Sequence, residues 1–118
     1  MKKKNLFWIL SFLFFFTQCK KANDVVVNEI TYEVTLINST TWHGSYLNEN
    51  AEVVGISNVP SGWKYIFKDS KQIGVATLNA YSDGVNLNAD ANMKIYLNGK
   101  IVATGKSSSS PTLQYLIP

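Results

Sequence analysis

The stretch Met93-Lys94-Ile95-Tyr96-Leu97-Asn98-Gly99-Lys100-Ile101-Val102-Ala103-Thr104 decides the fold of this 118-residue chain. Its two apolar halves flank Asn98-Gly99, the preferred pair for a two-residue type I′ turn, because both turn positions need a positive φ. The stretch therefore predicts a β-hairpin. The simplest register gives two cross-strand pairs, Ile95 with Val102 and Tyr96 with Ile101.

Period-two alternation continues on the N-terminal side of this hairpin. Residues 30, 32, 34 and 36 are apolar and alternate with Thr31, Glu33 and Thr35, as in a strand with one buried face. Further strands are expected at 41–47, 53–59, 63–68 and 73–81, with a closing strand at 113–117. The expected turns and loops are Asn48-Glu49-Asn50, Pro60-Ser61-Gly62 and the Ser107–Ser110 run.

Seven or so short strands with frequent turn signals predict an all-β fold. We expect a small antiparallel β-sandwich of immunoglobulin type. The inter-sheet disulfide of antibody domains cannot form, because Cys19 is the only cysteine in the chain. The immunoglobulin comparison therefore concerns architecture alone.

The N-terminus has the parts of a secretory signal. Lys2, Lys3 and Lys4 form a basic segment, and an apolar run follows at 6–16. A membrane-spanning helix needs roughly 20 apolar residues, so this run is too short to cross a bilayer. We expect a cleaved signal at 1–18, a tether at 19–28 and one domain at 29–118.

The sequence around Cys19 resembles the lipobox of bacterial lipoproteins, and its looser form with Cys-Lys is similar to those of the Bacteroidota. The resemblance implies acylation of the Cys19 sulfur and cleavage just before it. Gln18 differs from the small residue usual at that position. Two or more acyl chains hold a soluble domain stably at a bilayer, since each buried CH₂ contributes about 0.8 kcal/mol. Lys20 is not the aspartate of inner-membrane retention, which favours the outer membrane by analogy.

Charge excludes nucleic acid as a partner. The whole chain has 11 lysines, no arginine and 8 acidic residues, but three of the lysines lie in the signal. From Cys19 onward the 8 remaining lysines balance the 8 acids. A neutral chain lacks the basic face that phosphate backbones require, and without arginine it lacks a bidentate clamp for phosphate or carboxylate.

Several segments together resemble the MmpS family over residues 30 to 107. They are 32–35 (Tyr-Glu-Val-Thr), 46–50 (Tyr-Leu-Asn-Glu-Asn), 58–60 (Asn-Val-Pro), Trp63 and 93–102. The resemblance implies an extracytoplasmic β-sandwich tethered to a membrane, acting as an accessory to a large exporter. The mycobacterial members are held by a transmembrane helix and carry a cysteine pair, whereas this chain has Cys19 alone.

The candidate reactive and metal-binding residues do not form the motif of an enzyme. His43 is the only histidine, and no motif supplies the nucleophile and acid of a catalytic triad. Zinc would find only carboxylates beside that histidine. The series Asn86, Asn88, Asp90 and Asn92 resembles the start of a calcium loop, but Ala91 and Leu97 stand where that loop needs glycine and glutamate. We expect no catalytic residue, metal or cofactor.

The two tryptophans of the domain are candidates for a contact surface. Trp63 begins an alternating strand and is expected in the core. Trp42 lies between Thr41 and His43 near a strand start, so we predict a possible surface contact at the end of the sandwich.

Two functions follow from these observations. The first is a non-enzymatic, lipid-anchored interaction module that docks onto an envelope protein, for instance an exporter. The alternative is a tethered binding module for a small apolar or carbohydrate ligand. The interaction module should expose a flat patch or a free strand edge, and the ligand binder should enclose an aromatic-lined pocket of roughly 300 Å³ or more.

Overall fold

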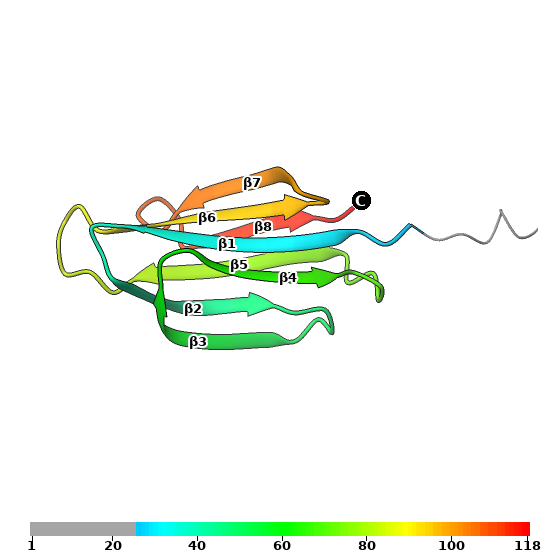
Figure 1. The fold of residues 1–118 in the computed structure, drawn as a ribbon, viewed down its shortest axis with the longest axis horizontal. Helices are drawn as coiled ribbons and strands as arrows, with labels where there is room; N and C mark the ends of the chain where they lie inside the picture. The colour runs from blue at the N-terminus through cyan, green and yellow to red at the C-terminus, as the bar shows by residue number, and fades with distance from the viewer. Residues whose placement is uncertain (1–25) are drawn as a thin grey trace, which may run out of the picture.

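The computed structural model describes residues 26–118 and confirms an all-β antiparallel sandwich. It has eight strands where about seven were expected. They are β1 (Glu29–Ile37), β2 (Thr41–Leu47), β3 (Val53–Pro60), β4 (Trp63–Lys68), β5 (Val75–Ser82), β6 (Asp90–Leu97), β7 (Lys100–Lys106) and β8 (Thr112–Leu116). Sheet A has the strand order β4-β1-β6-β7, and sheet B has the order β3-β2-β5-β8 (Figure 1).

The two ends of the sandwich differ in which parts of the chain they hold. The chain enters β1 at the end where β8 finishes, which we call the proximal end (Figure 1). Val26 and Ile117 line one hollow there. The loop between β5 and β6 lies at the opposite, distal end. Any tether that precedes β1 therefore leaves from the end remote from that loop.

Strand boundaries follow the alternation closely, and β2 matches its predicted range. The predicted start of β5 at Ile73 was two residues too early. Gln72 and Gly74 both have positive φ, of 53° and 85°, so the chain is still turning there. The nearly buried Asp69 holds this turn, because its carboxylate accepts a hydrogen bond of 2.9 Å from the backbone N–H of Ile73.

The β6–β7 hairpin is present with the predicted turn. Asn98 and Gly99 have φ of 52° and 81°, as a type I′ turn requires. Tyr96 faces Ile101 as predicted, but Ile95 faces Ala103 and not Val102. A β-bulge inserts one extra residue into β7 at this point, and both Val102 and Ala103 pack against the core as a result.

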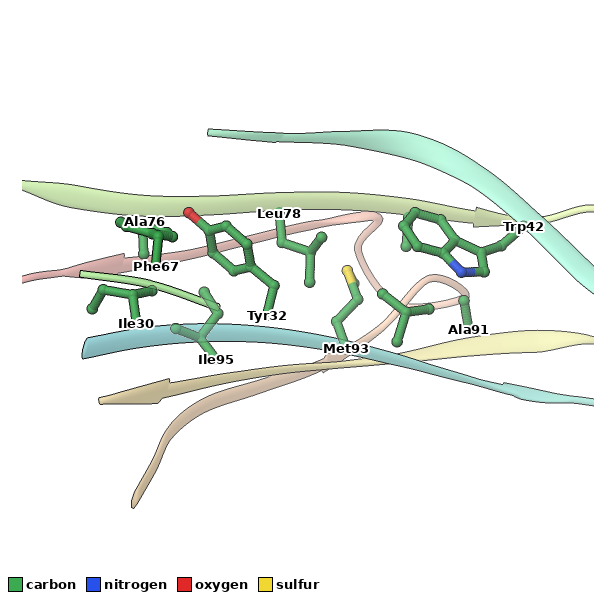
Figure 2. Close-up of a cluster of buried hydrophobic side chains, with 11 residues drawn as sticks. Ile30, Tyr32, Trp42, Phe67, Ala76, Leu78, Ala91, Met93 and Ile95 are labelled. Atoms are coloured by element: carbon green, nitrogen blue, oxygen red, sulfur yellow. The ribbon is translucent and has the colours of Figure 1, made fainter. Parts of the chain in front are cut away.

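The core lies between the two inner faces (Figure 2). Alternate residues of β1, β5 and β6 are buried, which is the period-two pattern expected for sheets with one covered face. The buried hydrophobic residues are Ile30, Tyr32, Val34, Trp42, Phe67, Ala76, Leu78, Ala80, Ala91, Met93 and Ile95.

The Tyr32 hydroxyl links the two sheets. Its ring belongs to β1 in sheet A, yet its O–H donates a hydrogen bond of 2.7 Å to the carbonyl of Leu47 in sheet B. It also accepts a bond of 3.3 Å from the N–H of Thr77, on a second strand of sheet B. Burial raises the pKa of Tyr32 to about 12, so the hydroxyl remains a donor throughout the physiological range.

Aromatic side chains fill the flank where β4 and β2 approach each other. Tyr46 packs on Trp63 and Tyr65, with ring centroids 5.3 and 4.5 Å apart. The Tyr65 hydroxyl donates to the carboxylate of Glu49 at 2.7–2.8 Å, and burial together with this bond raises its pKa. Trp63, predicted for the core, is half-buried at this flank.

Candidate interaction surfaces

Trp42 is not a surface residue, and the predicted contact at this side chain is wrong. Its exposed fraction is 0%, and its ring packs edge-on against Trp63 with centroids 5.2 Å apart. The strand alternation explains the error. Trp42 and Tyr46 are two of the residues that β2 directs inward, whereas the polar neighbours Thr41 and His43 gave Trp42 a surface-like context in the sequence.

His43 meets Asp83 at the distal end. The His43 Nδ1 lies 2.6 Å from one carboxylate oxygen of Asp83, and the Thr41 hydroxyl donates to the other oxygen at 2.9 Å. The hydrogen bond with His43 lowers the pKa of Asp83, with a smaller contribution from Thr41. The His43 ring also stacks on Tyr81. The hydroxyl of Thr41 bonds the acid and not the imidazole, so these three groups do not have the nucleophile–base–acid order of a triad.

Asp83 and its partners fix the start of the distal loop, which spans residues 83–89. A second contact closes the loop, because the Asn38 side chain donates to the carbonyl of Asn88 at 3.3 Å. Gly84 allows the two ends of the loop to lie close together, since a Cβ at this position would lie 2.5 Å from the Cβ of Ala89. The His43–Asp83 pair was not predicted, because its members are 40 residues apart along the chain.

The distal loop presents two aliphatic side chains directly to solvent. Val85 and Leu87 are fully exposed, at 105% and 101%. Single exposed aliphatic residues are common on protein surfaces. Here two of them alternate with asparagines on a loop that side-chain hydrogen bonds hold in place. The distal loop is therefore a candidate contact site.

The outward side of sheet B, which we call the uncharged face, is the second candidate surface. Strands β2, β3, β5 and β8, all within the described part of the chain, contain no Asp, Glu, Lys or Arg. A polar ladder crosses its centre. The Asn79 amide donates to the Ser45 hydroxyl at 2.9 Å, and the Thr112 hydroxyl donates to the Asn79 carbonyl oxygen at 2.6 Å.

The outward side of sheet A is charged, and Glu33 is paired within it. Glu33 accepts a hydrogen bond of 2.7 Å from the Tyr96 hydroxyl, and the Lys64 ammonium lies 3.4 Å from its other oxygen. Cross-strand register also places Lys94 opposite Glu33. The hydrogen bond from Tyr96, followed by Lys64, lowers the pKa of Glu33. These contacts stabilise the sheet and leave Glu33 committed within the molecule.

A hollow of about 310 Å³ opens at the proximal end. Its lining combines polar side chains such as Asp69 and Gln72 with Val26, Ile117 and the terminal Pro118. None of the residues that line it is aromatic. The hollow therefore lacks the aromatic lining expected of a pocket for an apolar or carbohydrate ligand.

The four residues that resemble the start of a calcium loop are divided between two elements. Asn86 and Asn88 belong to the distal loop, and Asp90 and Asn92 belong to β6. Asp90 accepts hydrogen bonds from the hydroxyls of Ser107 and Ser108 at 2.8 and 2.7 Å. Burial acts to raise its pKa, but these bonds outweigh it and lower the pKa. Within residues 26–118, no three His, Cys, Asp or Glu side chains gather in a group that could hold a metal ion.

Cys19 lies outside the described residues, as do the signal at 1–18 and most of the tether at 19–28. Residues 26–118 contain no helix with the length and hydropathy needed to span a bilayer. No known protein family matches this chain, and no curated protein matches it in sequence. The likeness to the MmpS family therefore stays a prediction from the motifs quoted above.

Proposed function

We propose that this protein is a non-enzymatic, lipid-anchored interaction module on an extracytoplasmic face of a bacterial envelope. Its N-terminal sequence supports the anchor, because a short apolar signal precedes Cys19 in a lipobox-like context. The distal loop is the docking element in this proposal. The partner is an envelope protein with an apolar pocket, and an exporter is the class that the MmpS resemblance favours.

The exposure of Val85 and Leu87 is the observation that carries this proposal. Burying one such side chain is worth about 1.5–3 kcal/mol, and the folded monomer leaves both in water. A partner pocket recovers that free energy on binding. The contacts of Asp83 and Asn38 hold the loop in the unbound protein, so little conformational entropy remains to be lost when it docks.

The position of the loop fits an anchored protein. Residues 19–28 cover at most about 35 Å when extended, and they join the domain at its proximal end. The distal loop lies at the end of the domain remote from this attachment, where it can reach a partner beyond the bilayer surface. Asp83 and Asp90 bracket the loop in sequence, whereas a loop that inserts into anionic lipid is normally bracketed by lysine or arginine. A protein partner is therefore favoured over a second membrane.

Photocrosslinking in the native envelope tests the docking element. A photoreactive amino acid replaces Val85 or Leu87 in the full chain, and the matched control places it at Ile66, which is 57% exposed on the outward side of sheet A. We expect one discrete adduct from the loop positions, containing a second protein, and none from Ile66. Equal adducts from loop and control, or adducts with lipid alone, would contradict the proposal.

The anchor is tested separately by Cys19→Ala. Without the acylated sulfur, we expect the protein to move from the membrane fraction to the soluble extract with its domain still folded, as circular dichroism of the protein purified from that extract can show. Mass spectrometry of the parent protein should find acyl chains on Cys19. An unchanged distribution between the two fractions would defeat the lipid hypothesis and leave the docking loop to be judged by its own crosslinks.

A further inference from the structure

The surface charge of the sandwich is divided between its sheets in an unequal way. Each strand of sheet A contains two charged residues, and sheet B contains none. Exposed sheet faces normally carry charge, which keeps them soluble and separate. Depletion of charge is instead a property of the centres of protein interfaces.

We propose that the uncharged face binds the uncharged face of a second copy of this chain, in a two-fold dimer whose axis runs parallel to the strands. A charged partner would find no group of opposite sign on this face. A second copy presents strands that are equally free of Asp, Glu, Lys and Arg, so the centre of each face brings no ionised side chain into the contact, and Asp83 beside His43 lies at its distal edge.

The polar ladder lowers the free energy needed to bury the centre of the uncharged face. Asn79 both donates to Ser45 and accepts from Thr112 within one copy. These groups keep their hydrogen bonds when water is excluded, and a buried polar group costs free energy mainly when it loses its partners. Gly55 lies opposite Ser45 in the register and leaves space above β3 for a partner side chain.

The two-fold axis determines which strands meet. Rotation about an axis parallel to the strands exchanges left and right across the sheet, so β3 of one copy lies over β8 of the other. Val53 and Leu116 on these strands are 75% and 79% exposed. Val53 pairs with Leu47, and Gln114 pairs with Thr77. The two pairs lie at a similar level along the strand direction. Val53 therefore comes opposite the segment of the second copy that holds Gln114 and Leu116.

This geometry also suits two anchored proteins, a step that rests on the proposed function. An axis along the strands keeps the proximal ends of both copies on the same side, so both lipids can enter one bilayer. Antiparallel pairing of two β3 edges would point the proximal ends in opposite directions. Face-to-face packing is thus the arrangement that a shared membrane permits.

The size of the face predicts a weak dimer in solution. Four strands spaced about 4.8 Å apart, with roughly seven residues at about 3.3 Å each, give an area near 440 Å² per copy. The total of roughly 900 Å² lies at the low end of specific interfaces. Confinement to a membrane raises the effective concentration, and we expect the dimer to form chiefly there.

Thiol crosslinking in membranes tests the dimer. Two full-length versions with different tags are expressed together, one with Val53→Cys and the other with Gln114→Cys. A short bismaleimide suits the spacing, because packed sheets lie about 10 Å apart. We expect a mixed-tag product of twice the monomer mass, at least ten times more abundant than the product of the matched sheet A pair, Ile66→Cys with Ile101→Cys.

Added charge provides the second arm of the test. Leu116→Lys on the uncharged face should reduce the mixed-tag product at least ten-fold, whereas Ile66→Lys should leave it unchanged. Both positions are exposed in the monomer, so folding is retained. Equal products from both sheets, no product from the Val53–Gln114 pair, or a product that survives Leu116→Lys would overturn the dimer. If Cys19 proves not to be acylated, the same cysteine pairs in a Cys19→Ala background, as purified full-length protein at millimolar concentration, give the test without a membrane and without a competing thiol.

Discussion

Sheets A and B share one core but differ on their outward sides. Inside, both follow the same alternation, and Tyr32 of sheet A is hydrogen-bonded to two strands of sheet B. Outside, sheet A has an ion pair and a charge-assisted hydrogen bond at Glu33, while sheet B has the neutral ladder through Asn79. Folding requires the common inner pattern. The outward sides are not needed to form the core, and they are where we propose that this protein contacts other molecules.

The largest expected effect comes from a glycine of sheet B that has no equivalent in sheet A. A Cβ on Gly44 would lie 2.0 Å from the backbone carbonyl oxygen of Asn79, on the neighbouring strand. Gly44→Ala must therefore separate β2 from β5, and we expect a loss of about 3 kcal/mol or more in the free energy of unfolding. Chemical denaturation measures it.

Gly105 provides the control for Gly44 on sheet A. A Cβ there would contact the flexible tip of Leu113 at 3.3 Å, so Gly105→Ala should cost less than about 1 kcal/mol. Similar losses for the two variants would show that the close approach at Gly44 does not constrain sheet B.

A smaller effect is expected from the charge network of sheet A. Glu33→Gln removes a charge-assisted hydrogen bond from Tyr96, at a cost of about 1 kcal/mol near pH 7. The folded-state pKa of Glu33 is lowered, so its contribution is complete above the unfolded pKa of about 4.3 and disappears as the pH falls through the folded value.

Denaturation of Glu33→Gln and the parent protein at pH 7 and pH 3 measures this contribution. The difference between them should shrink at pH 3. Asn79→Ala, which cuts the neutral ladder of sheet B, should cost a similar amount at both pH values. A difference for Glu33→Gln that stays constant with pH would contradict the assignment of the charge.

The smallest effects should come from added lysines on the outward sides. Val53→Lys in sheet B and Ile66→Lys in sheet A both replace exposed side chains. In monomeric protein at low concentration, each should change the free energy of unfolding by less than about 0.5 kcal/mol. A large loss for Val53→Lys alone would show that the uncharged face is needed for folding, and it would weaken the case for an interface.

The sequence predicted the strands well because they depend on local alternation and on turn chemistry. β2 and the turn at Asn98-Gly99 were found as expected. The bulge that places Ile95 opposite Ala103 was not predicted, because no residue in β7 marks it. It becomes visible only when Val102 and Ala103 are both seen to pack against the core.

The candidate surfaces were harder to predict because they depend on how distant segments assemble. Trp42 was placed at the surface from its neighbours, whereas the pairing of β2 between β3 and β5 puts it inside. His43 meets Asp83 only after β2 and β5 become adjacent. The uncharged face could not be recognised without knowing which four strands share a sheet. Val85 and Leu87 alternate with asparagines as the residues of a half-buried strand would, so the sequence alone does not mark them as exposed.

The aromatic cluster gives this protein built-in optical probes of its tertiary packing. Trp42 and Trp63 meet nearly at right angles with ring centroids 5.2 Å apart, and Tyr46 lies 5.3 Å from Trp63. Transition dipoles at such separations couple, so the folded domain should show an exciton couplet in its circular dichroism. Tyrosine emission should be transferred to the indoles and should reappear when the sheets separate. The opening of the sandwich can therefore be followed by spectroscopy without attaching a dye.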